Sequence, residues 1–105
     1  MDVDNSIETE VTVNVIEKEK IAVPSKWKVV LLNDDYTPID FVVSILIDIF
    51  NKSHEDAVKI TLEVHNNGRG IAGIYTLEVA DQKISDIHVI ANKEGYPLRA
   101  IAEQI

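Results

Sequence analysis

Cysteine is absent from this 105-residue sequence, so neither a disulfide framework nor a cysteine-ligated zinc site can form. No apolar run approaches the roughly 18 residues that a membrane-spanning helix requires. The first ten residues, MDVDNSIETE, lack the basic region and apolar core of a secretory signal and the arginines of a transit peptide. We therefore expect a soluble, cytoplasmic protein.

Basic clusters are also missing. The chain has 18 acidic and 10 basic residues and a formal net charge of −8. A phosphate backbone is bound mainly through Lys and Arg, so this composition argues against a nucleic-acid partner.

The acidic charge is concentrated at the start of the chain. Residues 1–25 hold six acidic and two basic residues, hence a net charge of −4, and residues 1–24 contain no aromatic residue. We expect residues 1–24 to be a flexible acidic extension. At 46% hydrophobic residues, the chain is long enough for one core, which we assign to residues 25–105.

Hydrophobic periodicity predicts three strands and three helices. Trp27, Val29 and Leu31 alternate with residues of the other face, which is typical of a strand. The predicted order is strand 26–33, helix 39–51, helix 54–67, strand 70–77, a helix opened by Thr76 and ending at Gly95, and strand 97–102. This β-α-α-β-α-β order predicts an α/β (α+β) two-layer sandwich, with three helices packed on a three-stranded antiparallel sheet.

Local signals mark the ends of the helices. Thr37 is the expected N-cap of the first helix, with Pro38 at its first position. Ser53 is the expected cap of the second helix, and Gly68 is expected to end it in a left-handed conformation. Gly73 is expected to mark a β-bulge or a close backbone approach.

Asn33, Asp34 and Asp35 form a polar loop directly after the first strand. Thr61, Val64 and His65 share one face near the end of the second helix. If the two regions meet, acceptor groups surround an apolar cavity whose complement is a primary ammonium beside a bulky apolar group. The residues alone leave two simpler readings open, namely turn and cap chemistry for the aspartates and a helix-dipole contact for His65.

Three segments stand out along residues 26–103: KVVLLNDDYTPIDFVV, LEVHNNGRGIAGIYTLEVA and YPLRA. Together they closely resemble the ClpS family, the bacterial adaptors of the Clp unfoldase–protease. The resemblance implies an adaptor without cofactor, metal or catalytic residues. Such an adaptor binds the free α-amino group and the bulky first residue (Leu, Phe, Tyr or Trp) of N-degron substrates and delivers them to a Clp ATPase.

The resemblance also assigns roles to positions. Asn33, Asp35 and His65 would engage the α-amino group, with Asp34 in support. The first side chain would enter a pocket of Thr37, Ile39, Val42, Thr61, Val64 and Leu98. Glu78 and Lys83 would contact the N-terminal domain of a hexameric ClpA- or ClpC-type ATPase, and the adaptor would be a monomer.

Two positions depart from the family pattern. Many relatives carry methionine where this chain has Ile39 and Thr61. A β-branched side chain is stiffer at χ1 than methionine, so the pocket should adapt less to different first residues.

Two other functions are compatible with parts of the sequence. An enzyme or metal site would use Asp34, Asp35 and His65, but no metal motif such as H-E-x-x-H is present, His54 lies at a helix start and His88 is expected on an exposed helix face. The alternative to the adaptor is a structural docking domain on a larger assembly, without recognition of N-termini.

Overall fold

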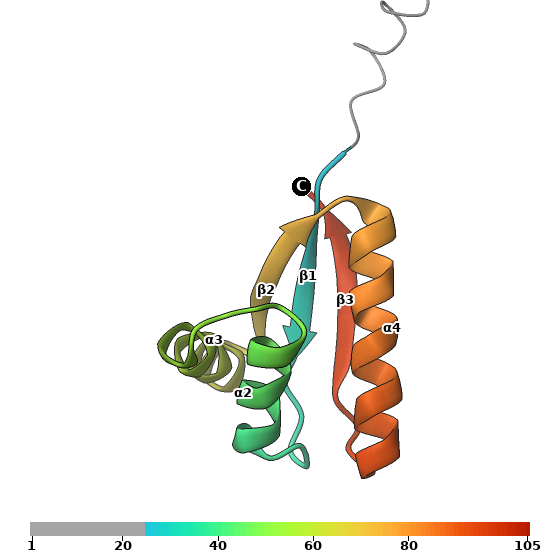
Figure 1. Cartoon of the computed structure of the whole chain (residues 1–105). Coiled ribbons are helices and arrows are strands. Elements are labelled where there is room, and N and C mark those ends of the chain that lie inside the picture. Colours follow the sequence, from blue (N-terminus) through green and yellow to red (C-terminus); the bar gives the residue numbers. More distant parts are fainter. Residues whose placement is uncertain (1–24) are drawn as a thin grey trace, which may run out of the picture.

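The computed structural model describes residues 25–105 (Figure 1), and the extension expected for residues 1–24 lies outside this range. The elements in order are β1 (Trp27–Leu32), α2 (Ile39–Asp48), α3 (His54–Asn67), β2 (Arg69–Tyr75), α4 (Leu77–Glu94) and β3 (Arg99–Gln104). The predicted order of strands and helices is confirmed.

Strand β1 lies at the centre of a three-stranded sheet of order β2-β1-β3, and both pairings are antiparallel. The register on β2 shifts between Val29, which faces Gly73, and Val30, which faces Ile71. Ala72 is therefore the extra residue of a bulge, which confirms the prediction for Gly73. A Cβ atom at Gly73 would lie 2.7 Å from ring carbons of Tyr75, so the position is also crowded.

The core lies between the helices and one face of the sheet. Val29 and Leu31 of β1 are fully buried in one cluster with residues of all three helices, including Leu46, Val64 and Ile87. Fully burying such a side chain is worth about 1.5–3 kcal/mol. The opposite face of the sheet carries the alternate residues of each strand, such as Lys28, and no helix of residues 25–105 covers it. The molecule therefore has the two layers expected of the sandwich.

Capping residues end α3 and α4 as predicted. The side chain of Ser53 accepts a hydrogen bond from the Asp56 N–H at 3.1 Å, and Thr76 caps α4 in the same way. Gly68 and Gly95 follow the two helices with φ of 88° and 81°. Glycine adopts this left-handed conformation without steric cost, which lets each helix stop sharply.

The predicted cap of α2 is wrong. Pro38, not Thr37, occupies the N-cap position with extended backbone angles, and its carbonyl accepts the N–H groups of Phe41 and Val42 at 3.1 and 3.3 Å. The Thr37 hydroxyl instead donates to Asp34. Helix α2 therefore begins without a side-chain cap, and the Thr37 side chain is used within the preceding loop.

Two element ends also differ from the prediction. Helix α2 stops at Asp48 rather than residue 51, and Asn51 adopts a left-handed φ of 56° where the chain turns toward α3. Strand β3 runs from Arg99 to Gln104 rather than over 97–102. Its ladder continues past the apolar run because Glu103 pairs with Lys28 in the register.

Candidate functional site

Asp34 organises the loop that joins β1 to α2. One carboxylate oxygen, Oδ1, accepts the N–H groups of Tyr36 and Thr37 at 2.8 and 2.7 Å. The other, Oδ2, accepts the Thr37 hydroxyl at 2.8 Å. Both oxygens of Asp34 are thus engaged within the loop, as is typical of an aspartate that stabilises a turn. Asp34 thereby holds Tyr36 and Thr37 in place.

These hydrogen bonds keep Asp34 ionised. Partial burial alone would raise the pKa of its carboxyl, but the bonds from the Thr37 side chain and from the Thr37 and Tyr36 N–H groups outweigh burial and lower the pKa below the ordinary 3.8. The negative charge of Asp34 is therefore part of the folded loop.

Asp35 is arranged differently from Asp34. It is exposed, and no hydrogen bond or ion pair with residues 25–105 engages its carboxylate. Asp34 thus organises the turn, and within residues 25–105 the second carboxylate of the pair has no hydrogen-bond partner.

One backbone hydrogen bond joins the loop to the end of α3. The Asn33 N–H donates to the carbonyl of Gly68 at 2.9 Å, and the Gly68 N–H in turn donates to Val64 at 2.9 Å. His65 is in the last turn of α3. The left-handed Gly68 therefore brings Asn33 and His65, 32 positions apart in the sequence, to the same end of the sheet.

A cavity of about 190 Å³ opens at this place. Val42, Thr61 and Val64 are buried, while Ile39 is 48% exposed, so the cavity has a closed apolar wall and Ile39 at an accessible position. An apolar cavity of about 150 Å³ can hold benzene, so this one has room for one large side chain. Nine predicted site residues line it: Asn33, Asp34, Asp35, Thr37, Ile39, Val42, Thr61, Val64 and His65.

Thr61 is the one polar or charged residue that is buried within residues 25–105. Its hydroxyl donates to the carbonyl of Ala57, one turn back on α3, at 2.7 Å. A threonine hydroxyl has a single proton, so Thr61 has only acceptor capacity left.

Leu98 does not line this cavity. It is 2% exposed in the core, and it borders a different cavity between α4 and β3. It helps to hold β3 against the helices, so its predicted place in the pocket wall remains a prediction.

The two residues expected to contact a partner lie on α4. Glu78 is exposed in its first turn. Lys83 is partly buried, donates to the Ile49 carbonyl at 2.8 Å, and lies 5.5 and 5.2 Å from the ring centroids of Phe50 and Tyr75. The start of α4 is at the opposite end of the sheet from the Asn33 loop (Figure 1).

The expected exposure of His88 is wrong. His88 is partly buried, and its Nε2 accepts the N–H of Ala100 on the edge strand β3 at 3.2 Å. Burial, together with the charge of Arg99, lowers the pKa of the imidazole. His88 and Asn92 lie one helical turn apart, and this spacing is the sequence signal that could have revealed a shared surface.

Within residues 25–105, no group of three or more His, Asp or Glu side chains is placed to hold a metal ion. No helix in that part of the chain has the length and apolar character needed to cross a membrane.

A sheet covered on one face by helices, with an apolar cavity ringed by acceptors, defines a small α/β binding domain. The family model for ATP-dependent Clp protease adaptor protein ClpS matches residues 22–101. The chain therefore belongs to the ClpS family of Clp protease adaptors.

Similar proteins agree with this assignment. The ATP-dependent Clp protease adapter protein ClpS of Oleidesulfovibrio alaskensis is 45% identical over 97% of this chain and 98% of its own length. The ClpS adapter protein of Clostridium acetobutylicum is 49% identical, over 90% of this chain and 93% of its own length. The solved structure of Agrobacterium tumefaciens ClpS2 bound to L-phenylalaninamide has a TM-score of 0.77 and 29% identity, and it aligns over 79% of this chain and all of that one.

Proposed function

We propose that the cavity between the Asn33 loop and α3 binds the first residue of N-degron proteins, which the chain delivers as an adaptor to a Clp unfoldase–protease. The observation that carries the proposal is the combination at one place of an apolar cavity of about 190 Å³ and the Asp35 carboxylate, which no partner within residues 25–105 engages. A free amino terminus with a Leu, Phe, Tyr or Trp side chain has the complementary charge and shape.

The ammonium group would be held by acceptors at the cavity mouth. Asp35 supplies the charge, and the Asn33 amide oxygen and a neutral His65 nitrogen can accept the remaining protons. A carboxylate about 4 Å from an ammonium gains roughly 4 kcal/mol at an effective dielectric of 20, before desolvation is subtracted. A protonated His65 would repel the ammonium, so the neutral form is the binding form.

The apolar wall would supply the second part of the affinity. Burying a side chain of Leu or Phe size contributes on the order of 1.5–3 kcal/mol. Together the two parts support micromolar binding after the entropic cost of association. L-phenylalaninamide, the ligand of the Agrobacterium protein, combines a free amino group with a phenyl side chain.

The partner would be the N-terminal domain of a hexameric Clp ATPase of the ClpA or ClpC type. We place its contact surface at Glu78 and Lys83 of α4, on the basis of the resemblance and of the exposure of Glu78. Because this surface lies at the far end of the sheet from the cavity, a monomeric adaptor can hold a substrate and the ATPase together.

A fluorescence titration tests the binding proposal. Labelled peptides that differ only in their first residue are titrated with the full chain, and peptides beginning with Leu, Phe, Tyr or Trp should bind at least tenfold more tightly than one beginning with Ser. Equal affinity across the series would indicate a docking domain that does not read the amino terminus.

A further inference from the structure

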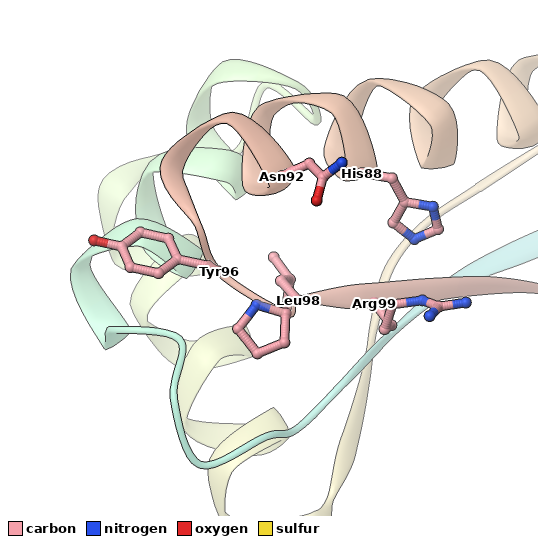
Figure 2. A pocket seen from close by; sticks show the side chains of 6 residues that line it. His88, Asn92, Tyr96, Leu98 and Arg99 are labelled. Atoms are coloured by element: carbon pink, nitrogen blue, oxygen red, sulfur yellow. The ribbon is translucent and has the colours of Figure 1, made fainter.

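A cavity of about 540 Å³ lies between the second half of α4 and the start of β3 (Figure 2). His88 and Asn92 reach it from α4, and Leu98 and Arg99 reach it from the chain that enters β3. It shares no lining residue with the cavity beside the Asn33 loop, so the two are separate sites.

The polar side chains of this cavity offer hydrogen-bond donors. Because Nε2 of His88 accepts the Ala100 N–H, a neutral imidazole must carry its proton on Nδ1. His88 therefore has one donor left, and the Arg99 guanidinium and the Asn92 amide add others. None of the six residues that line the cavity is acidic. A carboxylate accepts hydrogen bonds from all of these groups, so an acidic side chain is the complementary ligand.

Arg99 differs from Arg69 in its ion pairing. Both arginines are exposed and face Leu32 from the two edge strands. Arg69 pairs with Glu103, whereas neither ion pair found between residues 25 and 105 includes Arg99. Burial, and then the charge of Arg99, lower the pKa of His88, so the imidazole stays neutral and the guanidinium is the positive group of the cavity.

The two cavities lie on opposite sides of the Asn33 loop. His65 lines the smaller one from α3, and the Asn33 N–H donates to Gly68 just before β2. On the other side, Arg99 begins β3 and faces Leu32, the residue before Asn33 (Figure 1). Adjacent strands lie about 4.7–4.9 Å apart, so the starts of β2 and β3 are roughly 10 Å apart across β1. An extended chain covers this distance with about three residues.

We propose that the cavity at Arg99 receives an acidic side chain of the same substrate whose first residue is held beside the Asn33 loop. Counted from that first residue, the extended substrate arrives at Arg99 near its fourth residue, and a Glu or Asp there pairs with the guanidinium. The proposal rests on the function proposed for the smaller cavity and narrows its substrate class. Preferred substrates have a bulky first residue and an acidic residue near position four, and Arg99 determines this preference.

Calorimetry with paired peptides tests the proposal on the full chain. The parent peptide begins with Phe and contains no acidic residue, and the pairs carry either Glu or Gln at one of positions two to six. We expect Glu at position four to bind about fivefold more tightly than Gln, the upper range for an exposed ion pair, with smaller differences at positions two and six. Raising the salt concentration should reduce the difference, because exposed charges are screened.

Arg99→Gln should remove the difference between the Glu and Gln peptides, and Arg69→Gln is the matched control that should retain it. Asn92→Asp is a second variant, at an exposed position of α4. It places a carboxylate in the cavity beside Arg99, so the preference for Glu should be lost although the arginine is still present.

The possible failures of the two proposals are distinguishable. Equal affinity of the Glu and Gln peptides at every position would overturn the preference at Arg99 and leave the function of the smaller cavity intact. An equal loss of the preference in both arginine variants would also overturn it, because only the overall charge would then matter. If neither peptide binds, the function proposed for the smaller cavity fails, and the preference at Arg99 fails with it.

Discussion

Two of the cavities within residues 25–105, one beside the Asn33 loop and one between α4 and β3, carry opposite chemistry at their rims. The smaller of these two, about 190 Å³, combines an apolar wall with an amide, an imidazole and the Asp35 carboxylate, which no hydrogen bond or ion pair within residues 25–105 engages. The larger, about 540 Å³, gathers a guanidinium and other donors beside an apolar wall. The first is complementary to a cation and the second to an anion, so the chemistry of the rim, rather than the size, assigns a ligand to each.

The origins of the two rims differ as well. In the smaller cavity, Asp34 is fully engaged in the turn and thereby leaves Asp35 available. In the larger one, Ala100 engages one nitrogen of His88 and thereby leaves the other as a donor. In each case a structural hydrogen bond determines which polar group is presented to a ligand.

The largest effect should come from Asp35→Ala. Loss of a charged acceptor should weaken binding of a Phe-initiated peptide by about 1.5–3 kcal/mol, or at least tenfold, measured by calorimetry. Asp40→Ala, an exposed acid in the first turn of α2 that does not line the cavity, is the control and should leave affinity unchanged. Equal losses in the two variants would mean that only the overall charge matters.

Asp34→Ala should instead act on the fold. Removing the acceptor of three loop hydrogen bonds should cost about 0.5–2 kcal/mol of unfolding free energy, as for a lost helix cap, and peptide affinity should fall as the loop loosens. Denaturant unfolding measures the first effect. Unchanged stability would show that Asp34 does not organise the loop.

Asp34 also predicts a pH dependence of stability. Its folded pKa is lowered by the Thr37 and Tyr36 hydrogen bonds against the opposing effect of burial, so folding favours the ionised form. This stabilisation is complete above the ordinary value of 3.8 and is lost as the pH falls through the lower folded value. Asp34→Asn should therefore lose less stability than the unaltered chain on acidification through this range, and parallel curves would refute the assignment.

Thr61→Val should have a smaller and selective effect. The Thr61 hydroxyl can only accept, so a Tyr or Trp first residue can donate to it and a Phe cannot. We expect a Tyr-initiated peptide to lose about 0.5–1.5 kcal/mol relative to a Phe-initiated one in competition titrations. If the affinities of both peptides change equally, the Thr61 hydroxyl does not distinguish the first side chains.

His88→Leu should have the smallest effect on the peptide site. Loss of the acceptor for the Ala100 N–H should reduce unfolding free energy by about 0.5–1.5 kcal/mol, while affinity for the Phe-initiated peptide stays the same. A change in that affinity would show that the two cavities are coupled.

Most of the fold could be predicted from local sequence signals. Ser53, Thr76, Gly68 and Gly95 mark helix ends through chemistry that acts within a few residues. The cap of α2 was missed because Thr37 has two possible partners, the helix and the Asp34 carboxylate, and only the folded loop decides between them.

The candidate site was also predicted in part. Helical spacing predicts that Thr61, Val64 and His65 share one face of α3, and nine of the ten residues predicted for the α-amino group and the side-chain pocket line a single cavity. Leu98 is not among the residues that line this cavity and packs in the core, so its place in the pocket wall stays a prediction. The cavity at His88 was missed because it depends on a hydrogen bond between α4 and β3, which no local pattern encodes.

Calorimetry with a matched peptide pair tests most directly whether the smaller cavity binds a cationic amino terminus. The full chain is titrated with a Phe-initiated peptide and with the same peptide acetylated at its α-amino group. We expect micromolar binding of the free peptide and none detectable for the acetylated one, since the ammonium that Asp35 would hold is gone. Equal affinities would contradict the proposed recognition.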